Sequence, residues 1–70
     1  MPSDADIENW FTYHPPTPEQ QAAYGAIRDQ AKALATLFNE SVGDCADKTA
    51  ALRKLRETVM AMNLAIACNP

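Results

Sequence analysis

The sequence predicts an all-α fold, with a short N-terminal helix followed by a long antiparallel helical hairpin. Two long segments repeat their apolar residues at spacings of 3 and 4, which is typical of amphipathic helices. Capping residues precede these segments, and a short break containing Gly43 separates them. The chain has 70 residues, of which 47% are hydrophobic and 21% charged. This composition indicates one small folded domain.

Residues 1–17 differ from the rest of the chain. Ser3 and Asp6 have the spacing of a helix cap and predict a short helix from about Asp4 to Trp10. The stretch Phe11-Thr12-Tyr13-His14-Pro15-Pro16 follows, and its prolines favour an extended path. Three of the five aromatic residues lie here, namely Trp10, Phe11 and Tyr13. We expect Trp10 and Phe11 to cover the open end of the hairpin or to fill a subunit interface.

The first long helix is predicted over residues 18–42. Thr17 as N-cap, Pro18 at the first helical position and Gln20 together form a capping-box signature. One apolar stripe runs along the helix through Tyr24, Ile27, Ala31, Leu34 and Phe38. Gly25 lies within this segment and is either a weak point, costing about 1 kcal/mol relative to Ala, or a point of close approach.

The second long helix is predicted over residues 45–68. Asp44 is the expected N-cap, Gly43 is the expected stop of the preceding helix, and Asn69-Pro70 is the expected end. Its apolar stripe runs through Leu52, Leu55, Val59, Met62 and Ile66. The many alanines of both helices allow close packing, so the two stripes predict an antiparallel hairpin.

The size of the chain predicts self-association. A domain of about 70 residues rarely encloses a sufficient core unless staples or partner subunits support it. The two cysteines, Cys45 and Cys68, lie at opposite ends of the second helix, about 34 Å apart at roughly 1.5 Å per residue. Because that separation exceeds disulfide reach, we expect two free thiols in a reducing compartment, the alternative being an intermolecular bridge through Cys68.

Several function classes are disfavoured by composition. The net charge of −3 argues against a non-specific DNA or RNA binder, which needs a basic face. No apolar run approaches membrane-spanning length, and the N-terminus lacks a secretory signal, so we expect an intracellular protein. A single histidine leaves no zinc-ligand set, and no nucleophile–base arrangement is present. We therefore predict a protein that is not an enzyme and has neither metal nor cofactor.

The candidate binding residues are an aromatic ring and several cations. Tyr13 precedes a rigid His-Pro-Pro stretch, which suits a platform for stacking a base, although packing is the alternative. His14 is a second candidate contact, unless its hydrogen bonds are satisfied locally. Arg28 and Lys32, four residues apart, share one face of the first helix and form a candidate anion site.

On the second helix, Arg53 and Arg56 are candidates for a second anion site. The alternative is a solvated surface with pairs such as Arg53–Glu57.

The chain resembles the phage-encoded anti-CBASS cyclic-oligonucleotide sponges. The resemblance rests on Phe11-Thr12-Tyr13-His14-Pro15-Pro16 and continues through Tyr24-x-x-Ile27-Arg28-Asp29-x-Ala31-Lys32. Two further matches are Lys54-Leu55-x-Glu57-x-Val59-Met60 and Asn63-x-Ala65-Ile66-Ala67-x-Asn69. The likeness extends from Ile7 to Asn69, and the Phe-Thr-Tyr-His-Pro-Pro segment is its most specific part.

The resemblance implies a compact homohexamer of helical hairpins that captures cyclic dinucleotides, such as 3′,3′-cGAMP, without hydrolysing them. Capture in the cytoplasm of the infected bacterium would block CBASS immunity. By position, Tyr13 matches the family's stacking tyrosine and Arg28 its phosphate-contacting residue. Cys68 stands where the family often has a basic residue associated with cyclic trinucleotides, so this departure disfavours trinucleotide binding unless Arg53 or Arg56 substitutes. Two alternatives stay open: a helical module that binds a host protein, and a sponge for cyclic ADP-ribose signals made by TIR enzymes.

Overall fold

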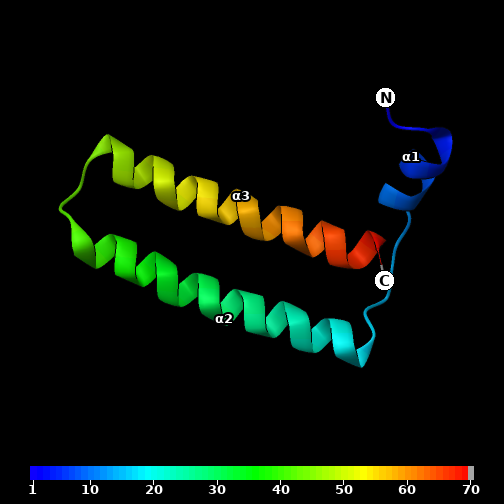
Figure 1. The fold of residues 1–70 in the computed structure, drawn as a ribbon, viewed down its shortest axis with the longest axis horizontal. Coiled ribbons are helices and arrows are strands. Elements are labelled where there is room, and N and C mark those ends of the chain that lie inside the picture. The colour runs from blue at the N-terminus through cyan, green and yellow to red at the C-terminus, as the bar shows by residue number, and fades with distance from the viewer. Residues whose placement is uncertain (70) are drawn as a thin grey trace.

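A computed structural model describes residues 1–69 and contains three helices (Figure 1). They are α1 (Asp4–Trp10), α2 (Pro18–Ser41) and α3 (Ala46–Cys68). The helices α2 and α3 lie antiparallel and in contact along their length, while α1 contacts the C-terminal end of α3. The predicted all-α fold, with a short helix before a long hairpin, is confirmed. Pro70, expected to end the second helix together with Asn69, lies outside the described residues.

Local hydrogen bonds explain where α1 and α2 begin. Ser3 caps α1, with its hydroxyl accepting from the Asp6 N–H at 3.1 Å and its own N–H donating to the Asp6 carboxylate at 3.0 Å. Thr17 and Gln20 repeat this reciprocal arrangement at the start of α2, at 3.1 and 2.9 Å. Both predicted N-termini are confirmed. They could be predicted from the sequence because these hydrogen bonds join residues only three apart.

The turn between α2 and α3 differs from the prediction. Asp44 was expected to cap α3, but the N-cap is Cys45, whose sulfur accepts from the Lys48 N–H at 3.4 Å. The Asp44 carboxylate is occupied elsewhere, in an ion pair with the Lys48 ammonium at 2.9 Å. The helix α2 ends at Ser41, two residues before the expected stop at Gly43, and Val42 leaves it in extended backbone at φ −143°.

Lys48 links the two helices at this turn. Its ammonium donates to the carbonyl oxygens of Val42 at 3.1 Å and Asn39 at 3.4 Å, so it supplies donors to the C-terminal end of α2. The hydrogen bond and charge of Lys48 also lower the pKa of the exposed Asp44 carboxyl. The resulting contribution to stability is present above the pKa of the unfolded carboxyl and is lost as the pH falls through the lowered, folded-state pKa.

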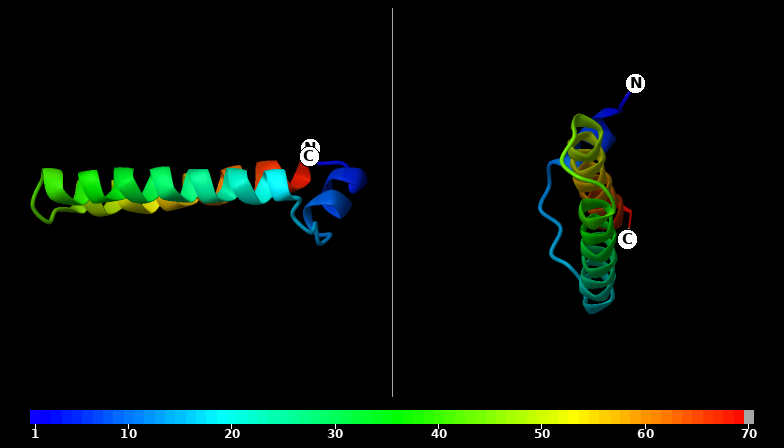
Figure 2. Two further views of the ribbon diagram at one scale, coloured as in Figure 1. Left: turned by 90° about the horizontal axis from the view of Figure 1, so that it is seen from below. Right: turned by 90° about the vertical axis from the view of Figure 1, so that its left-hand side faces the viewer.

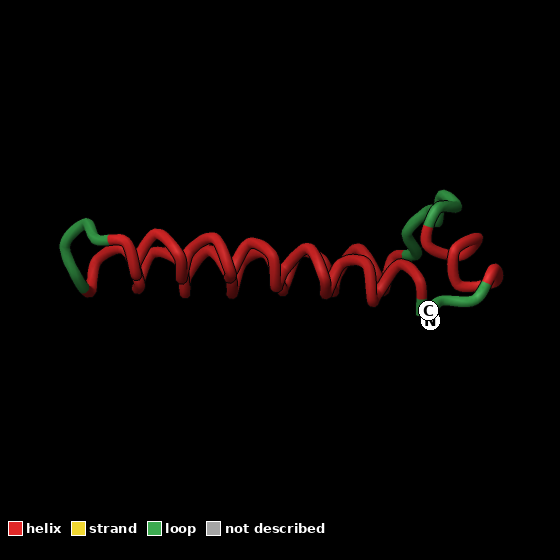
Figure 3. Tube along the Cα trace, turned by 90° about the horizontal axis from the view of Figure 1, so that it is seen from above, coloured by secondary structure: helices red, strands yellow, loops and turns green. Residues whose placement is uncertain are grey.

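The molecule is a single layer of helices (Figures 2 and 3). Its principal dimensions are 45 × 31 × 13 Å, and its radius of gyration of 15.3 Å exceeds the roughly 11 Å of a compact 70-residue domain. Its accessible surface is 5703 Å², whereas a compact monomer of this mass exposes about 4,300 Å². None of the described residues is buried as a whole, and no hydrophobic residue among them is enclosed. The single chain therefore has no enclosed core.

The predicted stripes do face each other across the hairpin, but they are only half-buried. Eight of their ten members are partly covered, and the two exceptions, Leu34 and Met62, are 39% and 45% exposed. The two cysteines lie at opposite ends of α3, as predicted, with Cys45 as the N-cap and Cys68 as the last residue, so they do not pair within one chain. Across residues 1–69, no helix is long and apolar enough to cross a membrane.

Replacing Lys48 by Met is expected to destabilise the turn. The variant keeps the aliphatic stem but removes the donors to Asn39 and Val42, so we expect a loss of about 1 kcal/mol in unfolding free energy. Thermal and urea unfolding followed by circular dichroism measure it. Lys54→Met is the matched control, because the Lys54 side chain makes no hydrogen bond or ion pair within residues 1–69. Equal stability of the two variants would contradict the assigned role of Lys48.

Candidate functional site

Tyr13 projects from the connection between α1 and α2. It lies in the extended segment that follows the last turn of α1, and its side chain is 82% exposed. Within residues 1–69 its hydroxyl forms no hydrogen bond, whereas the side chains on either side of it are engaged. Thr12 donates its hydroxyl to the Glu8 carbonyl, and His14 contacts the Asn9 carbonyl. The Tyr13 ring is thus exposed while its neighbours are hydrogen-bonded to α1. Such an arrangement suits a platform on which a base stacks.

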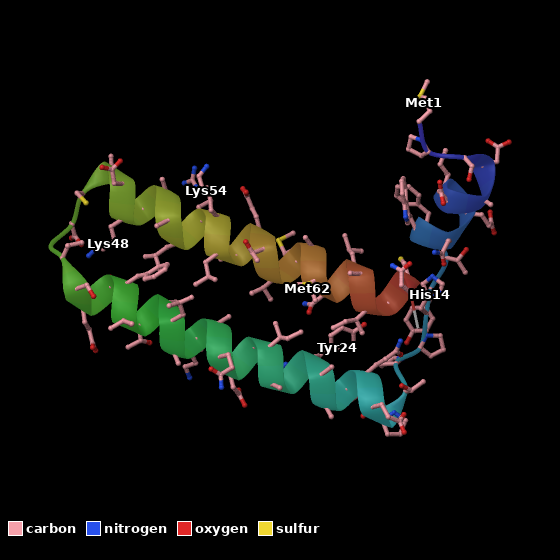
Figure 4. The ribbon with its side chains drawn as sticks, in the orientation of Figure 1. Met1, His14, Tyr24, Lys48, Lys54 and Met62 are labelled. Atoms are coloured by element: carbon pink, nitrogen blue, oxygen red, sulfur yellow. The ribbon has the colours of Figure 1, made fainter. Side chains whose placement is uncertain are left out.

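The imidazole of His14 forms a hydrogen bond within the chain. Its Nε2 lies 2.7 Å from the Asn9 carbonyl oxygen, and its side chain is half-buried at the end of α3 (Figure 4). A carbonyl oxygen only accepts, so Nε2 is the donor of this bond. The structure thus satisfies one ring nitrogen of His14 locally.

Three cations line one groove on one face of the hairpin. Arg28 and Lys32 come from α2, and Arg56 comes from α3 on the other side of the groove. The groove has a volume of about 410 Å³. Its remaining walls are aliphatic or carry a thioether, namely Ala31, Ala35, Leu52, Leu55, Val59 and Met60. Since no acidic side chain lines it, this groove suits an anionic ligand that also has apolar surface.

The cations of the groove are available for a ligand. Among residues 1–69, the one ion pair joins Lys48 and Asp44 at the turn. Arg28, Lys32 and Arg56 are exposed and form no ion pair within the described chain. The Arg53–Glu57 pair considered from the sequence is not formed either, and Arg53 does not line the groove. Arg56 therefore lies with Arg28 and Lys32, not with Arg53 in a separate group.

One chain does not bring Tyr13 to the cation groove. Tyr13 precedes α2, while Arg28 lies ten residues beyond Pro18, which corresponds to about 15 Å along the helix axis. His14, the neighbour of Tyr13, lies at the open end of the hairpin in Figure 4. Tyr13 is not among the residues that line the groove.

Two further grooves are apolar. Trp10 and Phe11 line one of about 380 Å³ with Leu64 and Cys68 of α3, and they are 47% and 85% exposed. The other, of about 630 Å³, contains the exposed stripe residues Leu34 and Met62. Cys68 is half-buried beside Asn9 and brings no positive charge to its groove. No three His, Cys, Asp or Glu side chains within residues 1–69 are arranged to hold a metal ion.

The sequence did not reveal the grouping of Arg56 with Arg28 or the role of Asn9. Both depend on how α1 and α3 are placed against other elements. The apolar stripes partly indicate the grouping of Arg56 with Arg28, because each arginine directly follows a stripe residue, Leu55 or Ile27, and therefore lies at the edge of the contact between the helices. No pattern in the sequence connects Asn9 with Cys68, which lies 59 residues further along the chain.

Comparison with known proteins identifies the family. No curated protein and no solved structure matches the chain. A match to the family described as "Acb2/Tad1, hairpin domain" covers residues 3–67, nearly the whole sequence. Proteins of this family are non-enzymatic phage sponges for cyclic nucleotide signals, acting against CBASS and Thoeris defence. The chain, with its tethered Tyr13 and its groove of unpaired cations, belongs to the Acb2/Tad1 hairpin domain family.

Proposed function

We propose that this protein sequesters cyclic dinucleotides, such as 3′,3′-cGAMP, and thereby blocks CBASS immunity in the cytoplasm of the infected bacterium. The observation that carries the proposal is the groove in which Arg28, Lys32 and Arg56 lie unpaired between apolar walls. A cyclic dinucleotide offers two phosphates to the cations and two bases to apolar or aromatic surfaces. Charge-assisted hydrogen bonds contribute about 1.5–3 kcal/mol each.

We further propose that the functional unit is a homo-oligomer, a hexamer by analogy with the sponges that the sequence resembles. The support is physical, since the isolated chain is one layer thick and exposes Leu34, Leu37, Leu64 and Met62. Stable domains bury such surfaces against a second layer. A second copy would supply that layer, and it would bring a further Tyr13 to the groove, which Tyr13 of the same chain does not line.

A site shared by two copies favours a dinucleotide over the alternatives. Two copies related by a two-fold axis present two Tyr13 rings and two cation groups, which matches the approximate two-fold symmetry of a cyclic dinucleotide. Cyclic ADP-ribose has one base and lacks that symmetry. A cyclic trinucleotide carries a third phosphate, and Cys68 provides no cation for it.

Native mass spectrometry tests the proposal directly. We expect a hexamer that gains up to three intact 3′,3′-cGAMP molecules, with no mass change from hydrolysis. A hexamer that binds cyclic ADP-ribose or a cyclic trinucleotide in its place would overturn the ligand assignment but keep the sponge function. A monomer that binds none of these nucleotides would favour the protein-interaction alternative.

Removal of the Tyr13 ring is expected to weaken binding. Tyr13→Ala should raise the Kd for 3′,3′-cGAMP at least tenfold, because stacking contributes about 1–3 kcal/mol per base. Tyr13→Phe keeps the ring and should stay within threefold of the parent, since the hydroxyl has no hydrogen bond to lose. Isothermal titration calorimetry measures both, and light scattering checks that the oligomer is intact. Equal losses in the two variants would mean that the ring does not stack.

Neutralising the groove is expected to change both affinity and its salt dependence. Arg28→Gln and Arg56→Gln should each raise the Kd at least tenfold and flatten its rise between 50 and 500 mM NaCl, since salt screens the lost attraction. Lys54→Gln is the matched control, because Lys54 lies on α3 outside the groove, and it should stay within twofold. If Arg56→Gln behaved like Lys54→Gln, Arg56 would not contact the ligand.

A further inference from the structure

The connection that carries Tyr13 is fixed at the C-terminal end of α3. The Asn9 side-chain amide donates to the Cys68 carbonyl at 3.0 Å in a partly buried contact. The last carbonyls of a helix have no partner within the helix, so this bond gives Asn9 a defined place against α3. It is also a long-range link, joining residues 59 apart in the chain.

The same residue also fixes the neighbour of Tyr13. The Asn9 carbonyl accepts from His14 Nε2 at 2.7 Å, and the Cys68 sulfur lies 3.9 Å from the same oxygen. Thr12, on the other side of Tyr13, donates to the Glu8 carbonyl. Asn9 thus connects α3 with His14, and the two residues that flank Tyr13 are both turned back onto α1. Pro15 and Pro16 follow directly and restrict the backbone further.

We propose that Asn9 and His14 are positioning residues, which hold Tyr13 in place for the ligand without touching it. This inference rests on the proposed function of Tyr13 as the stacking ring. A ring that is already held in its binding orientation loses less conformational entropy when a base stacks on it. The bond between His14 and Asn9 assigns His14 to this role in place of the direct ligand contact expected from the sequence.

A double-mutant cycle with matched controls separates positioning from general stability. We expect Asn9→Ala and His14→Ala to raise the Kd for 3′,3′-cGAMP five- to twentyfold by calorimetry. His14→Gln, whose amide restores a donor near Nε2, should stay within threefold. Asn69→Ala is the control, because Asn69 donates to the Ala65 carbonyl at 3.0 Å at the same helix end but makes no hydrogen bond to residues 9–14. It should stay within twofold.

The decisive comparison is the effect of Asn9→Ala on the Kd in the parent and in the Tyr13→Ala variant. If Asn9 acts through Tyr13, adding Asn9→Ala there changes the Kd less than twofold, because coupled residues are not additive. Full additivity would overturn the proposal. His14→Ala provides a second test should Asn9→Ala fail to fold by circular dichroism, because it leaves the bond between Asn9 and Cys68 intact.

Limited digestion with chymotrypsin gives a readout that needs no ligand. Cleavage after Phe11 or Tyr13 should be at least fivefold faster in Asn9→Ala and His14→Ala than in the parent and Asn69→Ala, because the released backbone can adapt to the active site of the protease. Equal rates in all four proteins would overturn the positioning role of Asn9 and His14. If the parent bound no 3′,3′-cGAMP yet its variants showed this pattern of cleavage, the proposed function would fail, but the restraint of residues 11–14 by Asn9 and His14 would be confirmed.

Discussion

The absence of a second layer is the constraint on which the rest of the structure depends. A helix pair one layer thick can cover only the seam between its two members, so Leu55 and Val59 are half-buried while Leu37 and Leu64 face outward. Burial of apolar surface is the main favourable contribution to the free energy of folding. An isolated hairpin buries only part of its apolar surface and gains only part of that free energy. The surfaces that remain open are also the walls of the grooves. Leu37 and Leu64 line the two apolar grooves, whereas the cation groove has other walls, so the proposed assembly and the proposed ligand site use different surfaces of one hairpin.

The parts of the fold that the sequence predicted well are those set by neighbours along the chain. The starts of α1 and α2 follow from Ser3 and Thr17 with their partners three residues later, and the stripes follow from helical periodicity. The turn was predicted less well. Asp44 has the right chemistry for an N-cap, but Lys48 competes for its carboxylate and Cys45 takes the cap. A cap preference of about 1 kcal/mol is too small to decide between such neighbours without the tertiary contacts.

In the candidate site too, local features were predicted from the sequence and features that depend on tertiary contacts were not. The exposure of Tyr13 and the shared face of Arg28 and Lys32 follow from local rules, namely the two prolines after His14 and the i, i+4 spacing. The resemblance to known sponges attached roles to Tyr13 and Arg28. The side of the groove contributed by α3 depends on the register of the hairpin, which no local rule fixes, so Arg56 was grouped with Arg53. The bond between His14 and the Asn9 carbonyl could not be predicted, because a backbone partner leaves no trace in the sequence; the ligand contact of His14 stays a prediction.

The acidic character of the chain is compatible with an anionic ligand because no acidic side chain lines the cation groove. Five of the six cations lie in the middle of the hairpin, where Asp29 and Glu57 are the neighbouring acids, and three of the nine acids lie in α1. At physiological ionic strength, exposed charges are screened beyond about 8 Å. A ligand in the groove therefore responds chiefly to Arg28, Lys32 and Arg56, and the distant acids contribute little. Net charge governs encounters with long polyanions, which span many Debye lengths, so a net charge of −3 disfavours nucleic acid polymers without disfavouring a small phosphate ligand.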